Sequence, residues 1–407
     1  MSPGSSRQHL YWISLGTVFS SAAIVLLQFL ALVSLEPAAF GRFSAVYLAF
    51  ALASSVLLSV VCEAWQRVRP VADWRQFSAP LLAHSVLSGV VTTLILALIP
   101  GYQGLAVFSG VAVGTATYRV GARYFAMHHR EYRWVVPADF ANVVVLVVGW
   151  ALFLFARDSF SITTVMIVWA ASSVVSAALS KPATGYAPSL VPSWLRTHNH
   201  EIKTLLGDSV LLDASGIGTP YALIPILGVN GFGVYRALSN VSGPVKLLLT
   251  PVRPLFAGVD AKRFARARSV ALFVGLSAVI GAVCYAAIVL LKLTGLEIGT
   301  LTALTDYAWE AGVFVGATFL NGVYYLLART HFTRRRLLSA RAVTSLAGIV
   351  LPIAGGLLFG IKGAIVAVTL ATVVIAVVWI VLLFGQTKNV SEPVDLDLGS
   401  DADVDVI

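Results

Sequence analysis

The sequence predicts an all-α integral membrane protein with about twelve transmembrane helices. Of its 407 residues, 58% are hydrophobic and only 12% are charged, whereas roughly 25% of the residues of a soluble domain are charged. The mean hydropathy is +0.86, and a spanning helix needs about 20 mostly apolar residues. These values exclude a soluble enzyme, a disordered chain and a secreted disulfide scaffold.

Twelve apolar segments follow one another along the chain, each long enough to form a spanning helix. They lie near residues 11–35, 43–62, 79–100, 104–126, 137–156, 162–180, 203–228, 232–252, 269–291, 306–328, 341–360 and 362–384. The first segment is too long for a signal peptide and lacks its small-residue cleavage site, so we expect it to remain as a helix.

The basic residues predict how these segments are oriented. With the N-terminus placed in the cytoplasm, 22 of the 28 lysines and arginines fall in cytoplasmic stretches and four fall in outer loops. Cytoplasmic loops carry an excess of Lys and Arg, so both termini are expected to be cytoplasmic. The remaining two, Arg236 and Lys246, lie inside the eighth segment.

Two polar stretches divide the chain. Residues 181–202 contain three prolines, Trp194 and several polar residues, a composition typical of a segment in the membrane interface. Residues 386–407 end in an acidic stretch, which favours a disordered cytoplasmic tail. We therefore expect a six-helix bundle over 1–180, an interfacial cytoplasmic linker over 181–202, a second six-helix bundle over 203–385 and a tail over 386–407.

The two halves share a short repeat. The second segment opens with Phe40-Gly41, and the eighth opens with Phe232-Gly233 after an offset of 192 residues. Each pair follows the first helix of its half. Repeats with the same orientation place a transporter's substrate site at the interface between the halves.

Three stretches carry a family resemblance: EPAAFGRF at 36–43, GFGVYRA at 231–237 and LFGIKGAIVA at 358–367. With the twelve-helix layout, residues 10–385 resemble the Wzx-like polysaccharide flippases of the MOP superfamily, relatives of MATE exporters and lipid II flippases. The resemblance implies a MOP/MATE-like fold whose two bundles alternate their openings. It also implies transport of a polyprenyl-pyrophosphate-linked oligosaccharide to the outer leaflet of the bacterial plasma membrane, for surface polysaccharide biosynthesis. Its expected partners are this lipid-linked glycan, membrane lipids and other polysaccharide-assembly proteins.

Basic residues inside the membrane are candidates for binding the pyrophosphate, because an ionisable group there is costly unless it is paired or hydrated. Arg119 and Arg123 are four residues apart and share a helix face, and a guanidinium fork suits phosphate. Arg236, Asn240 and Lys246 follow in the eighth segment. We expect these five residues to line a cationic cavity. Three alternatives are left open: headgroup anchoring by the arginines of the fourth segment, snorkelling of the eighth-segment arginine and an ion pair for the lysine.

Acidic residues of the seventh segment are candidates for coupling transport to a proton or cation. Asp208 and Asp213 enter from the cytoplasmic side, and Asp213 lies roughly 15 Å deep at 1.5 Å per residue. Gly216, Gly218 and Pro220 follow and favour a helix break. A carboxylate beside such a break is typical of transporter sites. Alternatively, Asp208 pairs with the lysine of segment eight, and Asp213 is a structural hydrogen-bond partner.

Asp139 follows Pro137 at the predicted start of the fifth segment, where a carboxylate suits the helix dipole. Cys62 and Cys284 lie in apolar segments and are expected to be small core residues rather than a disulfide or metal pair.

Two other function classes remain open. A MATE-like, ion-coupled exporter of small molecules needs carboxylates in an apolar cavity without an excess of bases. A polytopic membrane enzyme of glycan assembly needs a sizeable outer loop with catalytic groups, and the predicted outer loops are short. Nucleophile-elbow, zinc-protease, Walker and dinucleotide motifs are absent from the sequence. We therefore expect no enzymatic activity, no cofactor, no metal site and no nucleic-acid partner.

Overall fold

The computed structural model describes residues 3–67, 73–184, 189–245, 249, 261–332 and 334–389. All regular secondary structure in this part of the chain is helical. The N-terminal bundle consists of α1 (Pro3–Ser34), α2 (Pro37–Leu57) with its extensions η1 (Leu58–Glu63) and α3 (Ala64–Arg67), α4 (Trp74–Leu98), η2 (Gln103–Leu105), α5 (Ala106–His128), α6 (Tyr132–Phe155), η3 (Arg157–Ser159) and α7 (Ile162–Leu179).

Local sequence signals begin several of these helices. Pro37 occupies the first turn of α2, where its missing N–H is not needed. The Asp73 side chain caps α4 by accepting a hydrogen bond from the backbone N–H of Arg75 at 2.9 Å. Ser161 and Thr164 form a reciprocal capping box at the start of α7.

The second half begins with the short linker helix α8 (Leu190–Thr197). The C-terminal bundle consists of α9 (Asn199–Asp213), η4 (Ala214–Gly218), α10 (Thr219–Val241), α12 (Ala261–Phe264), α13 (Ala267–Thr294), α14 (Gly299–Ala303), η5 (Leu304–Tyr307), α15 (Ala308–His331) and α16 (Arg334–Asn389). Helix α9 therefore begins within the stretch that we expected to be linker. The Trp194 side chain of α8 is buried and donates a hydrogen bond to the Val60 carbonyl at 3.0 Å, so the linker packs against the N-terminal bundle.

Two of the long helices reverse direction at a glycine. In α10, Gly228 has φ +66°, and in α16, Gly360 has φ +61°, a backbone conformation that glycine adopts without strain. In α16 the arms on either side pack together: a Cβ at Gly355 would lie 2.4 Å from the carbonyl oxygen of Gly363. Helix α16 is therefore a hairpin with two arms long enough to span a membrane, whereas the short first arm of α10 continues α9 and η4.

Nine helical stretches in the described residues are long and apolar enough to span a membrane. Two of them, Ala214–Val245 and Arg336–Gly385, contain the reversals, so Arg336–Gly385 provides two spans and Ala214–Val245 provides two together with α9. Helix α5 is the remaining span and is less apolar because it carries Arg119 and Arg123. The predicted fold class, an all-α membrane protein of about twelve helices in two bundles, is confirmed.

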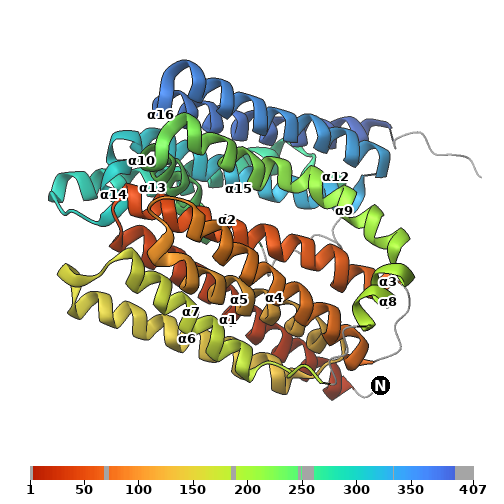
Figure 1. Ribbon diagram of the computed structural model, residues 1–407. Helices are drawn as coiled ribbons and strands as arrows, with labels where there is room; N and C mark the ends of the chain where they lie inside the picture. The colour runs from red at the N-terminus through yellow and green to blue at the C-terminus, as the bar shows by residue number, and fades with distance from the viewer. Residues whose placement is uncertain are drawn as a thin grey trace, which may run out of the picture.

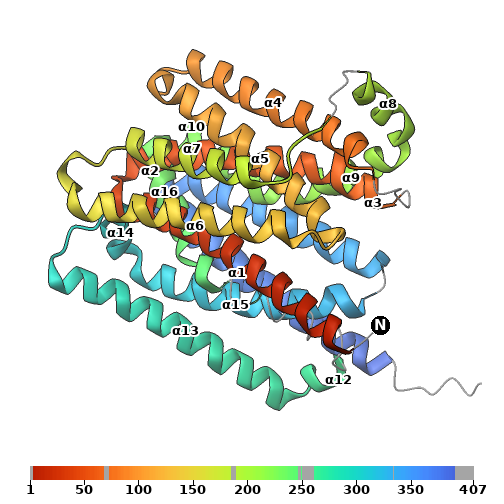
Figure 2. The same cartoon turned by 90° about the horizontal axis from the view of Figure 1, so that it is seen from below.

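The two bundles lie side by side, with α1–α7 in one and α9–α16 in the other (Figures 1 and 2). The N-terminus, α3, α8 and α12 lie at one end of the molecule, and α14 lies at the opposite end (Figure 1). We call these the N-terminal end and the α14 end. The charge asymmetry predicts that the N-terminal end is cytoplasmic.

The bundles are in close contact at the α14 end, where the Phe-Gly repeat lies. A Cβ at Gly41 of α2 would lie 2.2 Å from the carbonyl oxygen of Val229, and one at Gly233 of α10 would lie 1.9 Å from the carbonyl oxygen of Pro37. Helices α2 and α10 thus cross in direct backbone contact. Nearby, the Thr300 hydroxyl donates to the Leu35 carbonyl at 2.7 Å. The structure is therefore closed between the bundles at this end.

A second repeat between the two bundles is recognised from the way their helices pack. In each bundle, two adjacent helices approach through small residues: a Cβ at Gly110 would lie 2.6 Å from the Gly89 carbonyl oxygen, and one at Gly312 would lie 2.8 Å from that of Gly281. The contacting residues are Ser85, Gly89, Gly110 and Gly114 in the first bundle and Ser277, Gly281, Gly312 and Gly316 in the second. Ser277 and Gly281 follow Ser85 and Gly89 by the same 192 residues as the Phe-Gly repeat. Small residues at such spacing allow membrane helices to pack closely.

The orientation can be tested with single cysteines in a variant in which Cys62 and Cys284 are replaced by alanine. In intact cells, Leu296→Cys, between α13 and α14, should react with a membrane-impermeant thiol reagent because Leu296 is exposed. Ser193→Cys, on α8, should react only after the cells are opened. Labelling of Ser193→Cys from outside would contradict the predicted orientation.

Candidate functional site

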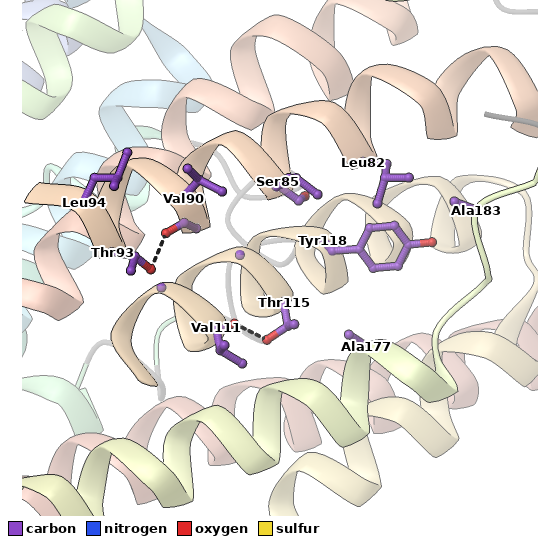
Figure 3. Close-up of a pocket in the computed structure, with 14 residues that line it drawn as sticks. Leu82, Ser85, Val90, Thr93, Leu94, Val111, Thr115, Tyr118, Ala177 and Ala183 are labelled. Carbon is purple, nitrogen blue, oxygen red and sulfur yellow. Dashed lines mark hydrogen bonds between the residues drawn. The ribbon is translucent and has the colours of Figure 1, made fainter. Parts of the chain in front are cut away.

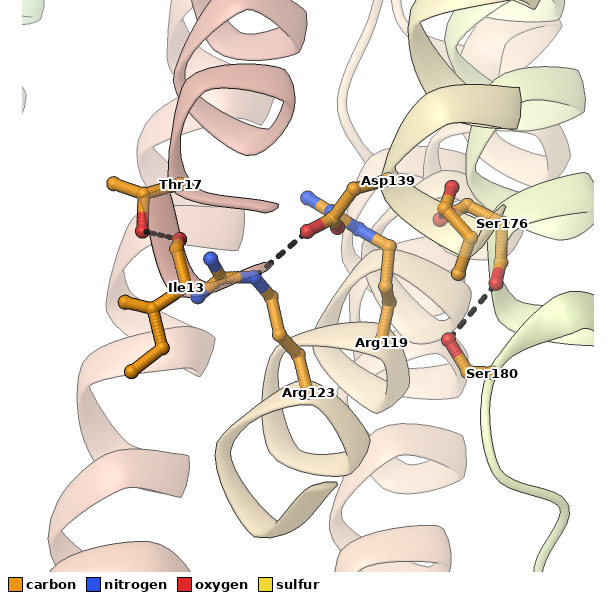
Figure 4. A network of polar contacts seen from close by, with 8 residues as sticks. Ile13, Thr17, Arg119, Arg123, Asp139, Ser176 and Ser180 are labelled. Atoms are coloured by element: carbon orange, nitrogen blue, oxygen red, sulfur yellow. Dashed lines mark hydrogen bonds and ion pairs between the residues drawn. The ribbon is translucent and has the colours of Figure 1, made fainter. Parts of the chain in front are cut away.

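A buried ion triad lies inside the N-terminal bundle (Figure 4). Arg119 Nη1 donates to Asp139 Oδ1 at 2.6 Å, and Arg123 Nε donates to Asp139 Oδ2 at 2.9 Å. The Asp139 side chain is only 1% exposed. The four-residue spacing on α5 places both guanidinium groups on the face toward α6. One carboxylate thus neutralises two arginines only in part, which leaves the triad with a net positive charge.

The structure corrects the predicted role of Asp139. Helix α6 begins at Tyr132 and contains Pro137, so Asp139 lies about two turns inside the helix and is not a first-turn residue. Its ion pairs with α5, rather than the helix dipole, account for its burial. Helix α1 covers the triad: a Cβ at Gly16 would lie 3.7 Å from Asp139 Oδ2 and 4.0 Å from Arg123 Nη2.

Arg119 also lines a small cavity within the N-terminal bundle. This cavity has a volume of about 100 Å³, and its lining includes Tyr47, Asn142, Trp169 and Ser172. Arg119 is the lining residue with a formal charge, and its ion pair to Asp139 remains intact beside the cavity. The N-terminal cavity is therefore small and carries a partly neutralised arginine.

A larger polar cavity of about 450 Å³ lies within the C-terminal bundle; we call it the C-bundle cavity. The charged residues in its described lining are Arg236 of α10 and Arg341 of α16, and that lining holds no carboxylate. Arg236 Nε is buried and has no hydrogen-bond partner among the described residues. Arg341 Nη1 donates to the hydroxyl of Tyr325, and the guanidinium lies 5.1 Å from the centre of that ring. Both arginines thus lack an acidic partner in the cavity wall.

The other polar groups of the C-bundle cavity come from four elements. The η4 turn, α10, α15 and both arms of α16 contribute hydroxyl groups and one amide. These residues are Ser215, Ser239, Thr318, Asn321, Thr344, Ser345 and Thr372. The hydroxyls of Thr344 and Thr372 donate to carbonyls of their own helix, so the wall combines positive charge with polar groups, some of which are already paired.

Asn240 links the two bundles and is not part of the C-bundle cavity wall. Its Nδ2 donates to Gln28 Oε1 of α1 at 2.7 Å. The sequence predicts Asn240 in the cavity wall with Arg236, but the neighbouring Ser239 lines the cavity instead. Asn240 thus connects α10 to α1 of the other bundle.

In place of the predicted break after Asp213, the helix continues through the π-helical turn η4. This turn also supplies Ser215 and Gly216 to the C-bundle cavity. Lys246 lies outside the described residues, and so does the side chain of Asp208. Their predicted roles, and that of Asp213 in coupling, stay predictions.

An apolar groove of about 600 Å³ lies between α4, α5 and α7 (Figure 3). No lining residue in the described chain carries a formal charge. Tyr118 lies at one end, where its hydroxyl donates to the Lys181 carbonyl at 2.7 Å. A similar apolar groove of about 390 Å³ flanks α13 and α15. Such grooves suit hydrocarbon chains and not a charged head group.

Sequence reasoning missed Arg341. We counted it as a residue of a cytoplasmic stretch because the apolar segment begins there, yet α16 begins at Arg334 and carries Arg341 two turns into the helix. A signal was present in the spacing: Arg341, Ser345 and Gly348 lie on one helical face and line the cavity together.

Comparison with known proteins shows which solved structures have a similar fold. No family model and no curated protein sequence matches the chain. Among solved structures, an outward-facing MATE family multidrug resistance transporter of the MOP superfamily aligns with a TM-score of 0.50 and 14% identity, over 93% of this chain and 96% of the other. Lipid II flippase MurJ, in an inward closed conformation, aligns with a TM-score of 0.56 and 12% identity, over 92% of this chain and 87% of the other.

These similarities define the class of fold. The chain has the all-α membrane fold of the MOP superfamily transporters. At 12–14% identity, the similarity shows only the fold. One of the two similar structures is an exporter and the other is a flippase, so the comparison does not choose between these functions. The choice between these two functions depends on the chemistry of the interior.

Proposed function

We propose that this protein is a flippase that moves a polyprenyl-pyrophosphate-linked oligosaccharide from the cytoplasmic to the outer leaflet by alternating access. Its role would be in surface polysaccharide biosynthesis at the bacterial plasma membrane. The observation that supports this function best is that, among the described residues, the polar interiors of the two bundles hold more arginine than carboxylate.

The surplus favours an anionic substrate. A charge removed from water needs a partner, since the desolvation penalty is otherwise several kcal/mol. In the N-terminal bundle two arginines share Asp139, and in the C-bundle cavity Arg236 and Arg341 face no carboxylate of the described lining. A pyrophosphate supplies the missing negative charge, whereas a cationic drug would be repelled by the same field.

The interior and the surface fit the two parts of such a substrate. The charged and hydroxyl-rich cavities suit a sugar pyrophosphate, and the apolar grooves on the outside of each bundle suit a prenyl chain. The close contact of α2 and α10 at the α14 end is the closure that alternating access requires on one side. Asp208 and Asp213 remain candidates for the coupling ion, and Lys246 for a further phosphate contact.

The proposal can be tested with purified protein in liposomes that contain a short-chain polyprenyl-pyrophosphate sugar labelled on the sugar. Wild-type protein should expose the label to an external sugar-modifying enzyme. Arg236→Gln should slow this exposure at least tenfold, because the buried guanidinium is lost. Lys362→Gln removes one charge from an exposed position and should change the rate less than twofold.

The same liposomes distinguish the flippase from the MATE-like exporter. A cationic dye should not accumulate under a proton or sodium gradient if the substrate is anionic. Gradient-driven uptake of the dye, together with no protein-dependent exposure of the labelled lipid, would reject the flippase in favour of the exporter.

A further inference from the structure

The C-bundle cavity differs from the N-terminal triad because its described lining contains no carboxylate. Asp139 accepts hydrogen bonds from both arginines of the triad. In the C-bundle cavity, Arg236 Nε is buried without a partner among the described residues, and Arg341 donates to the neutral hydroxyl of Tyr325. Since buried polar groups in proteins are nearly always satisfied, Arg236 needs an acceptor that the described wall does not supply.

We infer that the C-bundle cavity is an oxyanion site in which Arg236 and Arg341 bind a phosphate or pyrophosphate group, with Tyr325 as a neutral placeholder for Arg341. If the proposed function is correct, the oxyanion is the pyrophosphate head of the lipid-linked substrate. Arg341 and Tyr325 are then part of the binding machinery, in addition to the residues that the sequence predicts.

An oxyanion can displace the Tyr325 hydroxyl from Arg341 because it forms stronger hydrogen bonds with the guanidinium. A hydrogen bond between a guanidinium and an anionic oxygen is roughly twice as strong as one between neutral groups, and the guanidinium can donate two parallel bonds to a phosphate. A phenol hydroxyl offers only one neutral oxygen. The Tyr325 hydroxyl therefore accepts the hydrogen bond of Arg341 when the site is empty. When an oxyanion enters, the guanidinium donates to the oxyanion instead.

The cavity is large enough for more than a phosphate. Its volume of about 450 Å³ is many times the approximately 30 Å³ that one water occupies in the liquid. Hydroxyl groups of Ser239 and Thr318 and the amide of Asn321 face this volume. They can hydrogen-bond to the remaining phosphate oxygens or to sugar hydroxyls, so the site fits a sugar pyrophosphate.

The two arginines reach the cavity from different helices. Arg236 lies eight residues after the reversal at Gly228 in α10, and Arg341 lies seven residues after the start of α16. On α15 the cavity wall extends from Phe314 to Tyr325, about 16 Å at 1.5 Å per residue. Both arginines line this one cavity, and the π-helical turn η4 forms part of its wall. Turns of this type are frequent at functional sites.

Binding can be measured on purified protein in lipid nanodiscs by titration with inorganic pyrophosphate and, separately, with a short-chain polyprenyl pyrophosphate. Wild-type protein should bind both, and Arg236→Gln and Arg341→Gln should each weaken binding at least tenfold. Tyr325→Phe removes the placeholder and should strengthen binding about threefold or more. Lys362→Gln should bind like wild type, and melting curves confirm that each variant is folded.

The outcomes separate this inference from the proposed function. If only the polyprenyl pyrophosphate binds, and its binding depends on the arginines, the ligand is a lipid head group. If inorganic pyrophosphate also binds in an arginine-dependent way, the pyrophosphate itself is the recognised group. Wild-type affinity in the double variant Arg236→Gln with Arg341→Gln would overturn the inference, even if that variant still flips lipid. Arginine-dependent binding of pyrophosphate without any flipping would support the site and reject the proposed function.

Discussion

Replacement of Asp139 by asparagine should lower the free energy of unfolding by about 3–5 kcal/mol, the cost of removing one partner from a buried ion pair. The carboxylate is 1% exposed and accepts hydrogen bonds from Arg119 and Arg123. Asparagine preserves the size of the side chain but leaves two guanidinium groups without a counter-charge. The loss can be measured by reversible denaturation of the purified protein, and transport should fall with it.

Glu131→Gln is the matched control for this prediction. Glu131 accepts hydrogen bonds from Lys181 at 2.6–2.7 Å, but its side chain is 29% exposed, so the same carboxylate-to-amide change should cost at most about 1 kcal/mol. Replacing both arginines of the triad by glutamine in the Asp139→Asn background should recover part of the lost stability, because no unpaired charge then remains buried. Equal losses for Asp139→Asn and Glu131→Gln would show that the triad is not a buried ion cluster.

The spans were predictable from the sequence because each is a local feature. Twenty apolar residues predict a helix in a membrane regardless of their neighbours. Helix ends were less predictable, since hydropathy marks the part of a helix that lies in lipid and not where the helix begins. Helices α6 and α16 therefore start at Tyr132 and Arg334, five and seven residues before the apolar segments, and this difference misplaced Asp139 and Arg341.

The partners within the site were not predictable, because they depend on which helices are neighbours. Arg119 and Asp139 are twenty residues apart on different helices, and Tyr325 and Arg341 are sixteen apart across a loop. The repeat between the two halves can be found in the sequence only where corresponding residues are separated by 192 positions. Gly110 and Gly114 correspond in packing to Gly312 and Gly316 at an offset of 202, so a search at one fixed offset misses them.

Substitution of alanine for Gly233 should prevent closure at the α14 end and slow transport at least tenfold. The added Cβ would lie 1.9 Å from the carbonyl oxygen of Pro37 and 3.1 Å from the backbone nitrogen of Gly41. These neighbours are backbone atoms, which cannot turn aside as a flexible side chain would, so α2 and α10 must separate. Thr300 is fully buried at this contact, and a cysteine at position 300 should become reactive toward an impermeant thiol reagent in the Gly233→Ala variant.

The control is Gly275→Ala on α13, where the added methyl group meets no atom within 4 Å and transport should be unchanged. Gly41→Ala should reproduce the effect from the other helix, since its Cβ would lie 2.2 Å from the Val229 carbonyl oxygen. Melting curves separate loss of closure from unfolding, because an unfolded variant would also expose the cysteine at position 300 but would show no melting transition. If Gly233→Ala transports at the wild-type rate and the cysteine at position 300 stays unreactive, the α2–α10 crossing is fixed packing and plays no part in alternating access.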